Sequence, residues 1–211
     1  MYNITFISTV HIETGKCNAD ELYKIIKKIN PQVIFLEALQ ETYSEYDKLL
    51  FSSFGVYHTR LEISAIQKYS FNASFEYIPT LDNGLSDAFN KKYNIVCENI
   101  ELQKLIDNFN FLAINYGFQF LNSVESIRLH EEMRMLENSL LNDDKINKMV
   151  SEDIEEYENS MLRNIYSYCK KNQFDTAIFM CGSAHRKSII EKIGKFNVLE
   201  EISLKWKIFE N

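Results

Sequence analysis

The chain has 211 residues, of which 45% are hydrophobic and 13% aromatic, enough to bury one sizeable core in a single domain. Its formal net charge of −7 and its pI near 5.2 argue against a nucleic acid as the main partner. No apolar run approaches the roughly 20 residues that span a bilayer, and no basic leader precedes the first apolar run, so we expect a cytoplasmic protein without a membrane partner.

The beginning of the chain follows a strand–helix–strand pattern. Residues 4–10 form an apolar run that predicts a buried strand. Asn18, with an acidic residue three positions later, is a helix N-cap signal; apolar residues then recur at helical spacing until Pro31 ends the predicted helix. Residues 33–36 are a second continuous apolar run. We therefore predict that residues 2–37 form a βαβ unit with parallel strands.

Further strand signals frame a long helical stretch in the middle of the chain. The pattern of residues 38–70 suits helices but does not mark their limits. Later elements are predicted as a strand at 75–79, mainly helices over 84–172, a strand at 176–181, a helix at 186–193 and a strand at 203–209. Together these patterns predict one α/β domain over residues 1–211, with a mostly parallel sheet flanked by helices and a helical insertion at 84–172.

Two histidines occupy matching positions near opposite ends of the chain. His11 and His185 each follow an apolar strand-like run and a few small residues. Glu37 ends the second apolar run, and Asp82 follows the third predicted strand. If these strands are parallel and adjacent, their carboxyl ends meet at one edge of the sheet. Two imidazoles and one or two carboxylates would then line a single cleft.

This set of side chains has the ligand types of a divalent metal site. Imidazole and carboxylate groups from His11, Glu37, His185 and Asp82 suit manganese, zinc or cobalt. A bound ion would lower the pKa of its water to roughly 7, so the predicted chemistry is hydrolysis. Glu13 is close enough in sequence to His11 to orient it or to act as an acid or base.

These motifs resemble the superfamily that joins the TraB and TIKI proteins, the erythromycin esterases and the ChaN-like haem-binding proteins. The segments that carry the resemblance are Ser8–His11, Pro31–Glu37 and Gly182–His185. The resemblance implies an α/β fold whose cleft is lined by the two histidines and the glutamate. In the TIKI branch these residues serve a metal-dependent peptidase, and in the esterase branch a histidine is the general base.

The same resemblance points to an arginine. Family members often carry one on a helix before the last strand, and Arg163 stands in about that place, as a candidate for binding an anionic group or polarising a carbonyl. Arg128 is a weaker candidate. In contrast, Ser183 lacks the second glycine of a nucleophile elbow, and His58 and His130 have no partner motif, so a solvated helix face is expected for His130.

Three readings of function stay open. The first is a hydrolase in which His11, Glu37 and His185 bind a divalent metal and attack a peptide, ester or related carbonyl bond. The second is a metal-free, esterase-like hydrolase with His11 as general base and Arg163 holding the substrate. The third is a non-enzymatic protein, either a binder of haem or another small ligand or a regulatory module, which Ser8 in place of the family glycine keeps open.

Overall fold

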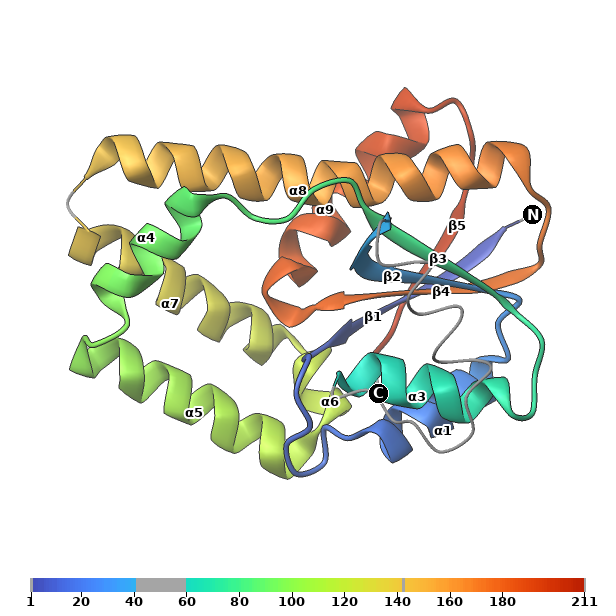
Figure 1. Cartoon of the computed structure of the whole chain (residues 1–211), viewed down its shortest axis with the longest axis horizontal. Coiled ribbons are helices and arrows are strands. Elements are labelled where there is room, and N and C mark those ends of the chain that lie inside the picture. The colour runs from blue at the N-terminus through green and yellow to red at the C-terminus, as the bar shows by residue number, and fades with distance from the viewer. Residues whose placement is uncertain (1, 41–59, 142, 211) are drawn as a thin grey trace.

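The computed structural model describes residues 2–40, 60–141 and 143–210 (Figure 1). Its centre is a five-stranded sheet in the order β3-β2-β4-β1-β5, and every pair of neighbouring strands is parallel. The strands are β1 (Asn3–Thr9), β2 (Val33–Leu39), β3 (Glu76–Leu81), β4 (Thr176–Gly182) and β5 (Lys205–Ile208). The predicted α/β class with a parallel sheet is therefore confirmed.

Helices cover both faces of the sheet, with α1 and α3 on one side and α8 and α9 on the other (Figure 1). A short 3-10 helix, η2 (Ser183–His185), connects β4 to α9. The helices are α1 (Ala19–Ile29), α3 (Leu61–Ser70), α4 (Asp87–Val96), α5 (Ile100–Tyr116), α6 (Phe118–Leu121), α7 (Val124–Leu141), α8 (Asp144–Lys171) and α9 (Arg186–Leu199). The predicted helical insertion in the middle of the chain is confirmed.

Strand β4 lies between β1 and β2, although these two strands are joined directly by α1. Met180 of β4 is in register with Ile7 of β1 on one side and with Leu36 of β2 on the other. Thr9 and Gly182 are also in register, so β1 and β4 reach the same edge of the sheet. The three adjacent strands β2, β4 and β1 therefore bring together the segments that carry Glu37, His185 and His11.

The alternation of side chains along each strand decides which helices they meet. In β4, Ile178 and Met180 belong to the core cluster under α1 and α3, whereas Phe179 and Cys181 belong to the cluster under α8 and α9. Phe35 of β2 shares the second cluster. Glu37 stands two residues after Phe35, so it faces α8 as well.

Most predicted boundaries are met within a few residues. Asn18 caps α1, because its Oδ1 accepts a hydrogen bond of 3.0 Å from the backbone N–H of Glu21. Helix α1 ends at Asn30, which adopts a left-handed φ of 52° directly before Pro31. Strand β2 is longer than the predicted run, so Glu37 lies within the strand and not beyond it. No helix in the described ranges has the length and apolar character to cross a membrane.

The loop between β1 and α1 packs tightly against the junction of α5 and α6. Gly15 has a φ of 51°, and a Cβ there would lie 2.5 Å from the carbonyl oxygen of Ile114. Gly117 has a φ of 60°, and a Cβ there would lie 2.8 Å from the carbonyl oxygen of Lys16. The Lys16 N–H donates a hydrogen bond of 2.9 Å to Ile114. Both positions therefore require glycine.

Candidate functional site

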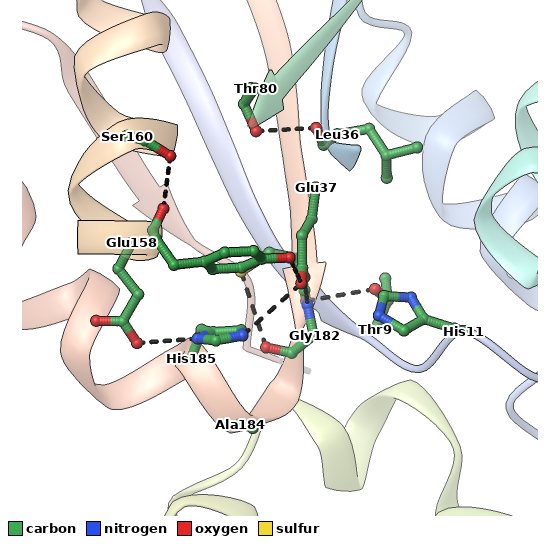
Figure 2. A network of polar contacts seen from close by, with 12 residues as sticks. Thr9, His11, Leu36, Glu37, Thr80, Glu158, Ser160, Gly182, Ala184 and His185 are labelled. Carbon is green, nitrogen blue, oxygen red and sulfur yellow. Dashed lines mark hydrogen bonds and ion pairs between the residues drawn. The ribbon is translucent and has the colours of Figure 1, made fainter. Parts of the chain in front are cut away.

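His11, Glu37 and His185 converge around Gly182 at the carboxyl edge of the sheet. A Cβ built on Gly182 would lie 3.4 Å from Glu37 Oε2, 3.8 Å from His185 Cδ2 and 4.0 Å from His11 Nε2. Figure 2 shows the two imidazoles on opposite sides of Glu37 and Gly182. The structure thus brings together three of the residues that the sequence singled out.

Glu37 is a buried carboxylate, 6% exposed, with a donor on each oxygen. Its Oε1 accepts a hydrogen bond of 2.7 Å from the Tyr157 hydroxyl, and its Oε2 accepts one of 2.5 Å from the Gly182 backbone N–H. The Nε2 atom of His185 lies 3.7 Å from Oε1. Burial and the charge of Glu37 raise the pKa of Tyr157, so this phenol stays protonated and donates.

His11 is held by Glu62, which α3 supplies. The imidazole Nδ1 lies 2.9 Å from Glu62 Oε1, and the Thr9 hydroxyl donates to the same oxygen at 2.7 Å. Glu62 is only 2% exposed, and the start of α3 is fixed beside His11 by a bond of 2.9 Å from the Leu61 N–H to the His11 carbonyl. The hydrogen bond with Glu62 raises the pKa of His11 by more than burial lowers it.

His185 has an equivalent partner on α8. Its Nδ1 lies 2.9 Å from Glu158 Oε1, and Glu158 is 2% exposed. The other oxygen of Glu158 accepts hydrogen bonds from the Ser188 hydroxyl and, at 2.9 Å, from Lys192 Nζ. Burial opposes ionisation of Glu158, but the hydrogen bonds from His185, Ser188 and Lys192 together keep its pKa below the ordinary value.

The two histidines therefore have the same chemistry. A carboxylate that accepts from Nδ1–H leaves Nε2 free to take up a proton in the neutral imidazole and to give one up in the imidazolium. His11 Nε2 is directed toward Gly182, and His185 Nε2 lies on the side of Glu37. The site thus presents two carboxylate-backed imidazoles with a buried carboxylate between them, an arrangement suited to acid–base catalysis.

Other predicted residues make their contacts elsewhere. Glu13 accepts a hydrogen bond of 2.7 Å from the backbone N–H of Ala19, at the start of α1, so it is Glu62 and not Glu13 that orients His11. Asp82 accepts one of 2.8 Å from the Asn164 side chain. Arg163 lies 2.5 Å from Glu156 and 4.0 Å from Asp82. Within the described residues, neither Glu13 nor Asp82 nor Arg163 bonds to His11, Glu37 or His185.

Two further candidates from the sequence are Arg128 and His58. Arg128 pairs with Glu125 and Glu132 along the exposed side of α7. His58 lies outside the described residues.

His130 departs from the expected solvated helix face. Its Nε2 lies 2.9 Å from the Ser183 hydroxyl, and its ring packs against Phe109 with centroids 4.6 Å apart. Burial lowers the pKa of His130 to about 4, so this imidazole is neutral near pH 7. One turn later, Arg134 donates a hydrogen bond of 3.3 Å to the carbonyl of Ala184. Helix α7 thus holds the segment that carries His185.

Sequence reasoning missed Glu62, Tyr157 and Glu158. Glu62 is flanked by Leu61 and Ile63, and Glu158 directly follows Tyr157, which belongs to an apolar helical stripe. An acidic residue among buried apolar neighbours is costly unless a partner faces it, and this was the available signal. The partner could not be identified, because it comes from a distant part of the chain in each case.

The described side chains do not match the predicted metal centre. In residues 2–40, 60–141 and 143–210, no group of three or more His, Cys, Asp or Glu side chains is arranged to hold a metal ion. Both oxygens of Glu37 already accept hydrogen bonds from protein groups.

The chain was also compared with known proteins. It matches no protein-family model, no curated protein and no solved structure. The resemblance to the TraB, TIKI and erythromycin esterase superfamily therefore stays a prediction that rests on the motifs alone.

Proposed function

We propose that the protein is a hydrolase that attacks an ester, peptide or related carbonyl bond by acid–base catalysis, with His11 and His185 as the acid–base pair. One observation carries this proposal: each imidazole has its Nδ1 2.9 Å from a glutamate that is 2% exposed. Both imidazoles are thereby oriented before substrate binds, at the edge of a parallel sheet where ligands of such folds bind.

In this mechanism His11 is the general base. Its Nε2 takes a proton from a water molecule while the water oxygen forms a bond to the carbonyl carbon. Glu62 stabilises the imidazolium that results, and the raised pKa of His11 makes it a stronger base. His185, protonated at Nε2, gives its proton to the leaving group as the bond to the carbonyl carbon breaks. Glu158, 2.9 Å from Nδ1, and Glu37, 3.7 Å from Nε2, flank the imidazole that makes this transfer.

The metal-dependent alternative has one observation in its favour. Histidines that bind metals also donate their second ring N–H to a carboxylate, as His11 and His185 do here. The described residues nevertheless do not supply a third ligand in a suitable arrangement. The metal-free mechanism is therefore the one we propose, and metal or haem binding stays a prediction.

The proposal is tested by screening purified protein against a panel of esters and peptides. His11→Gln and His185→Gln are expected to lose roughly 100-fold or more of kcat/KM, the usual contribution of a general acid or base. Arg163→Gln is the control, since its guanidinium pairs with Glu156, and it should stay within about twofold of the wild type. Chelator treatment should leave the activity intact.

Two results would contradict the mechanism. Full activity of either histidine variant would remove the acid–base pair. Loss of activity on chelation, restored by manganese or zinc, would establish the metal-dependent reaction in its place.

A further inference from the structure

A second cavity lies within the helical layer and borders the candidate site through Glu158. It has a volume of about 340 Å³ and is lined by residues of α4, α7, α8 and α9. In Figure 1, α8 and α7 form two sides of this region, and α4 and α9 lie at its two ends. At the end where Lys92 lies, the polar residues are Lys92, Arg134, Glu137, Asn138 and Asn147, and the rest of the lining carries the charged residues Glu155, Glu158, Glu191, Lys192 and Lys195.

Lys92 is a buried ammonium group whose three donors are not all matched by acceptors among the described residues. The residue is 6% exposed, and within the described part of the chain its Nζ donates one hydrogen bond of 2.5 Å, to Asn138 Oδ1. The nearest carboxylate, Glu137, is 3.8 Å away, which is an ion-pair distance beyond hydrogen-bond length. An ammonium has three donors, and a buried charge is costly unless it is paired. Burial accordingly lowers the pKa of Lys92.

Two groups near Lys92 also have unused hydrogen-bonding capacity among the described residues. Asn147 Oδ1 is buried and has no hydrogen-bond partner among the described residues, while its Nδ2 donates to the Asn138 carbonyl at 3.2 Å. The guanidinium of Arg134 makes one hydrogen bond in the described part of the chain, to Ala184. This end of the cavity therefore offers cationic donors from two residues and one acceptor from a third.

We propose that this end of the cavity binds a hydrogen phosphate group, either free or as a small monoester. Its anionic oxygens would accept from Lys92 and Arg134, and its P–O–H would donate to Asn147 Oδ1. Glu137 faces the same end and opposes the negative charge, so it moderates the affinity. The binding itself does not depend on the hydrolase mechanism, and its test needs no substrate.

The first experiment is titration of the whole protein with inorganic phosphate at pH 7 and constant ionic strength, followed by calorimetry and by NMR of the backbone amides. Sulfate is the matched control, because it has a similar shape and charge but no hydrogen to donate. We expect saturable phosphate binding at least tenfold tighter than that of sulfate, with shifts at Lys92 and Asn147. Equal affinity for the two anions, or shifts confined to residues outside the cavity, would overturn the proposal.

Substitutions of different cavity residues should change the affinity for phosphate in opposite directions. Lys92→Met should weaken phosphate binding at least tenfold, and Glu137→Gln should strengthen it several-fold. Asn147→Leu should reduce the affinity for phosphate to that for sulfate. Lys171→Met, an exposed lysine outside the cavity, should change nothing. If Lys92→Met does not fold, Glu137→Gln decides, since a weaker or unchanged affinity in that variant would refute the site.

The source of the phosphate group is distinguished by a second ligand. Glycerol phosphate that binds more tightly than inorganic phosphate would identify a monoester, whose organic part occupies the rest of the cavity. Tighter binding of inorganic phosphate would identify the free ion.

Discussion

At the scale of single residues, the two imidazoles owe their orientation to buried acids on different helices. Glu62 comes from α3 and Glu158 from α8, and each stands behind the Nδ1 atom of its histidine. Glu158 also binds Ser188 and Lys192, so its charge is shared among three donors, whereas Glu62 binds Thr9 and His11. His11 therefore depends more strongly on the charge of Glu62 than His185 depends on the charge of Glu158.

This difference leads to a prediction about pH. Glu62 raises the pKa of His11 above 6.5, so the pair contributes stability that is fully present below pH 6.5 and is lost as the pH rises through the raised value. In Glu62→Gln the pKa of His11 should fall, and the loss of unfolding free energy relative to wild type should be larger at pH 6 than at pH 8.5. An NMR titration of His11 and urea unfolding at both pH values measure the two effects.

Glu13→Gln is the matched control for this experiment. Glu13 is the acid nearest to His11 in sequence, but it binds the start of α1. Its replacement should leave the titration of His11 unchanged. A shift in Glu13→Gln as large as that in Glu62→Gln would show that the assignment of the orienting carboxylate is wrong.

The sequence identified the residues that lie in a strand or just after one, and it missed those that lie in α-helices. His11, Glu37 and His185 follow or end apolar runs, and parallel strands bring such positions to one edge. Glu62 and Glu158 are buried in α-helices, where most acidic residues face solvent, so their apolar neighbours are only a weak signal of burial. Their role depends on which helix packs over which strand, and that is a tertiary property.

At the scale of elements, the β1–α1 loop is fixed by two glycines from distant parts of the chain. Gly15 and Gly117 both have positive φ, and each approaches the backbone of the other segment. This loop follows His11 directly, so its anchoring on α5 and α6 limits where the histidine can lie. The helical insertion thus supports the site through the backbone as well as through side chains.

Gly15→Ala should therefore destabilise the protein by about 1–3 kcal/mol, because a Cβ would meet Ile114 and the left-handed backbone would be strained. Gly194→Ala serves as a control in which stability should rise instead of fall. Gly194 lies within α9, has nothing within 4 Å of an added Cβ, and should gain about 0.5–1 kcal/mol of stability. Urea unfolding measures both. Equal stability of the two variants would contradict the close packing of this loop.

At the scale of the whole molecule, Arg186 joins four parts of the chain. Its buried guanidinium donates to Asn122 Oδ1 at 2.8 Å, to the Phe209 carbonyl at 3.0 Å and to the Ser8 hydroxyl at 3.3 Å. Asn122 Oδ1 also accepts from the Ser8 N–H at 2.8 Å. This network connects β1, the segment between α6 and α7, α9 and the residue after β5. It also gives Ser8 a structural role that a glycine would lack.

Asn122→Ala should cost about 2 kcal/mol, because it leaves the Ser8 N–H buried without its partner and removes the shorter of the two hydrogen bonds of Arg186 Nη1. Asn115→Ala, on the exposed side of α5, should stay within about 0.5 kcal/mol of the wild type. Thermal and urea unfolding of both variants check the difference. A loss below about 1 kcal/mol for Asn122→Ala would mean that water replaces the amide in this network.

The class of the fold was predictable because the central strands β2 and β4 are nearly continuous apolar runs, as expected when helices cover both faces of a sheet. The order of the strands in the sheet was not predictable. Residues 2–37 indicate two parallel strands joined by a helix, and this pattern is the same whether the strands are neighbours or have β4 between them. Local patterns also could not assign α3 to the face that meets His11, because its apolar residues surround Glu62 without a clear stripe.

The position of β4 has a consequence for how the protein forms during synthesis. Strands β1 and β2 leave the ribosome early, but the strand that must separate them follows more than a hundred residues later. Until then the edges of β1 and β2 that β4 will occupy either stay unpaired or pair with each other and must part again, and such long-range pairing is slow. A nascent chain that ends before β4 would therefore expose aggregation-prone strand edges, and chaperone dependence should peak at that stage of translation.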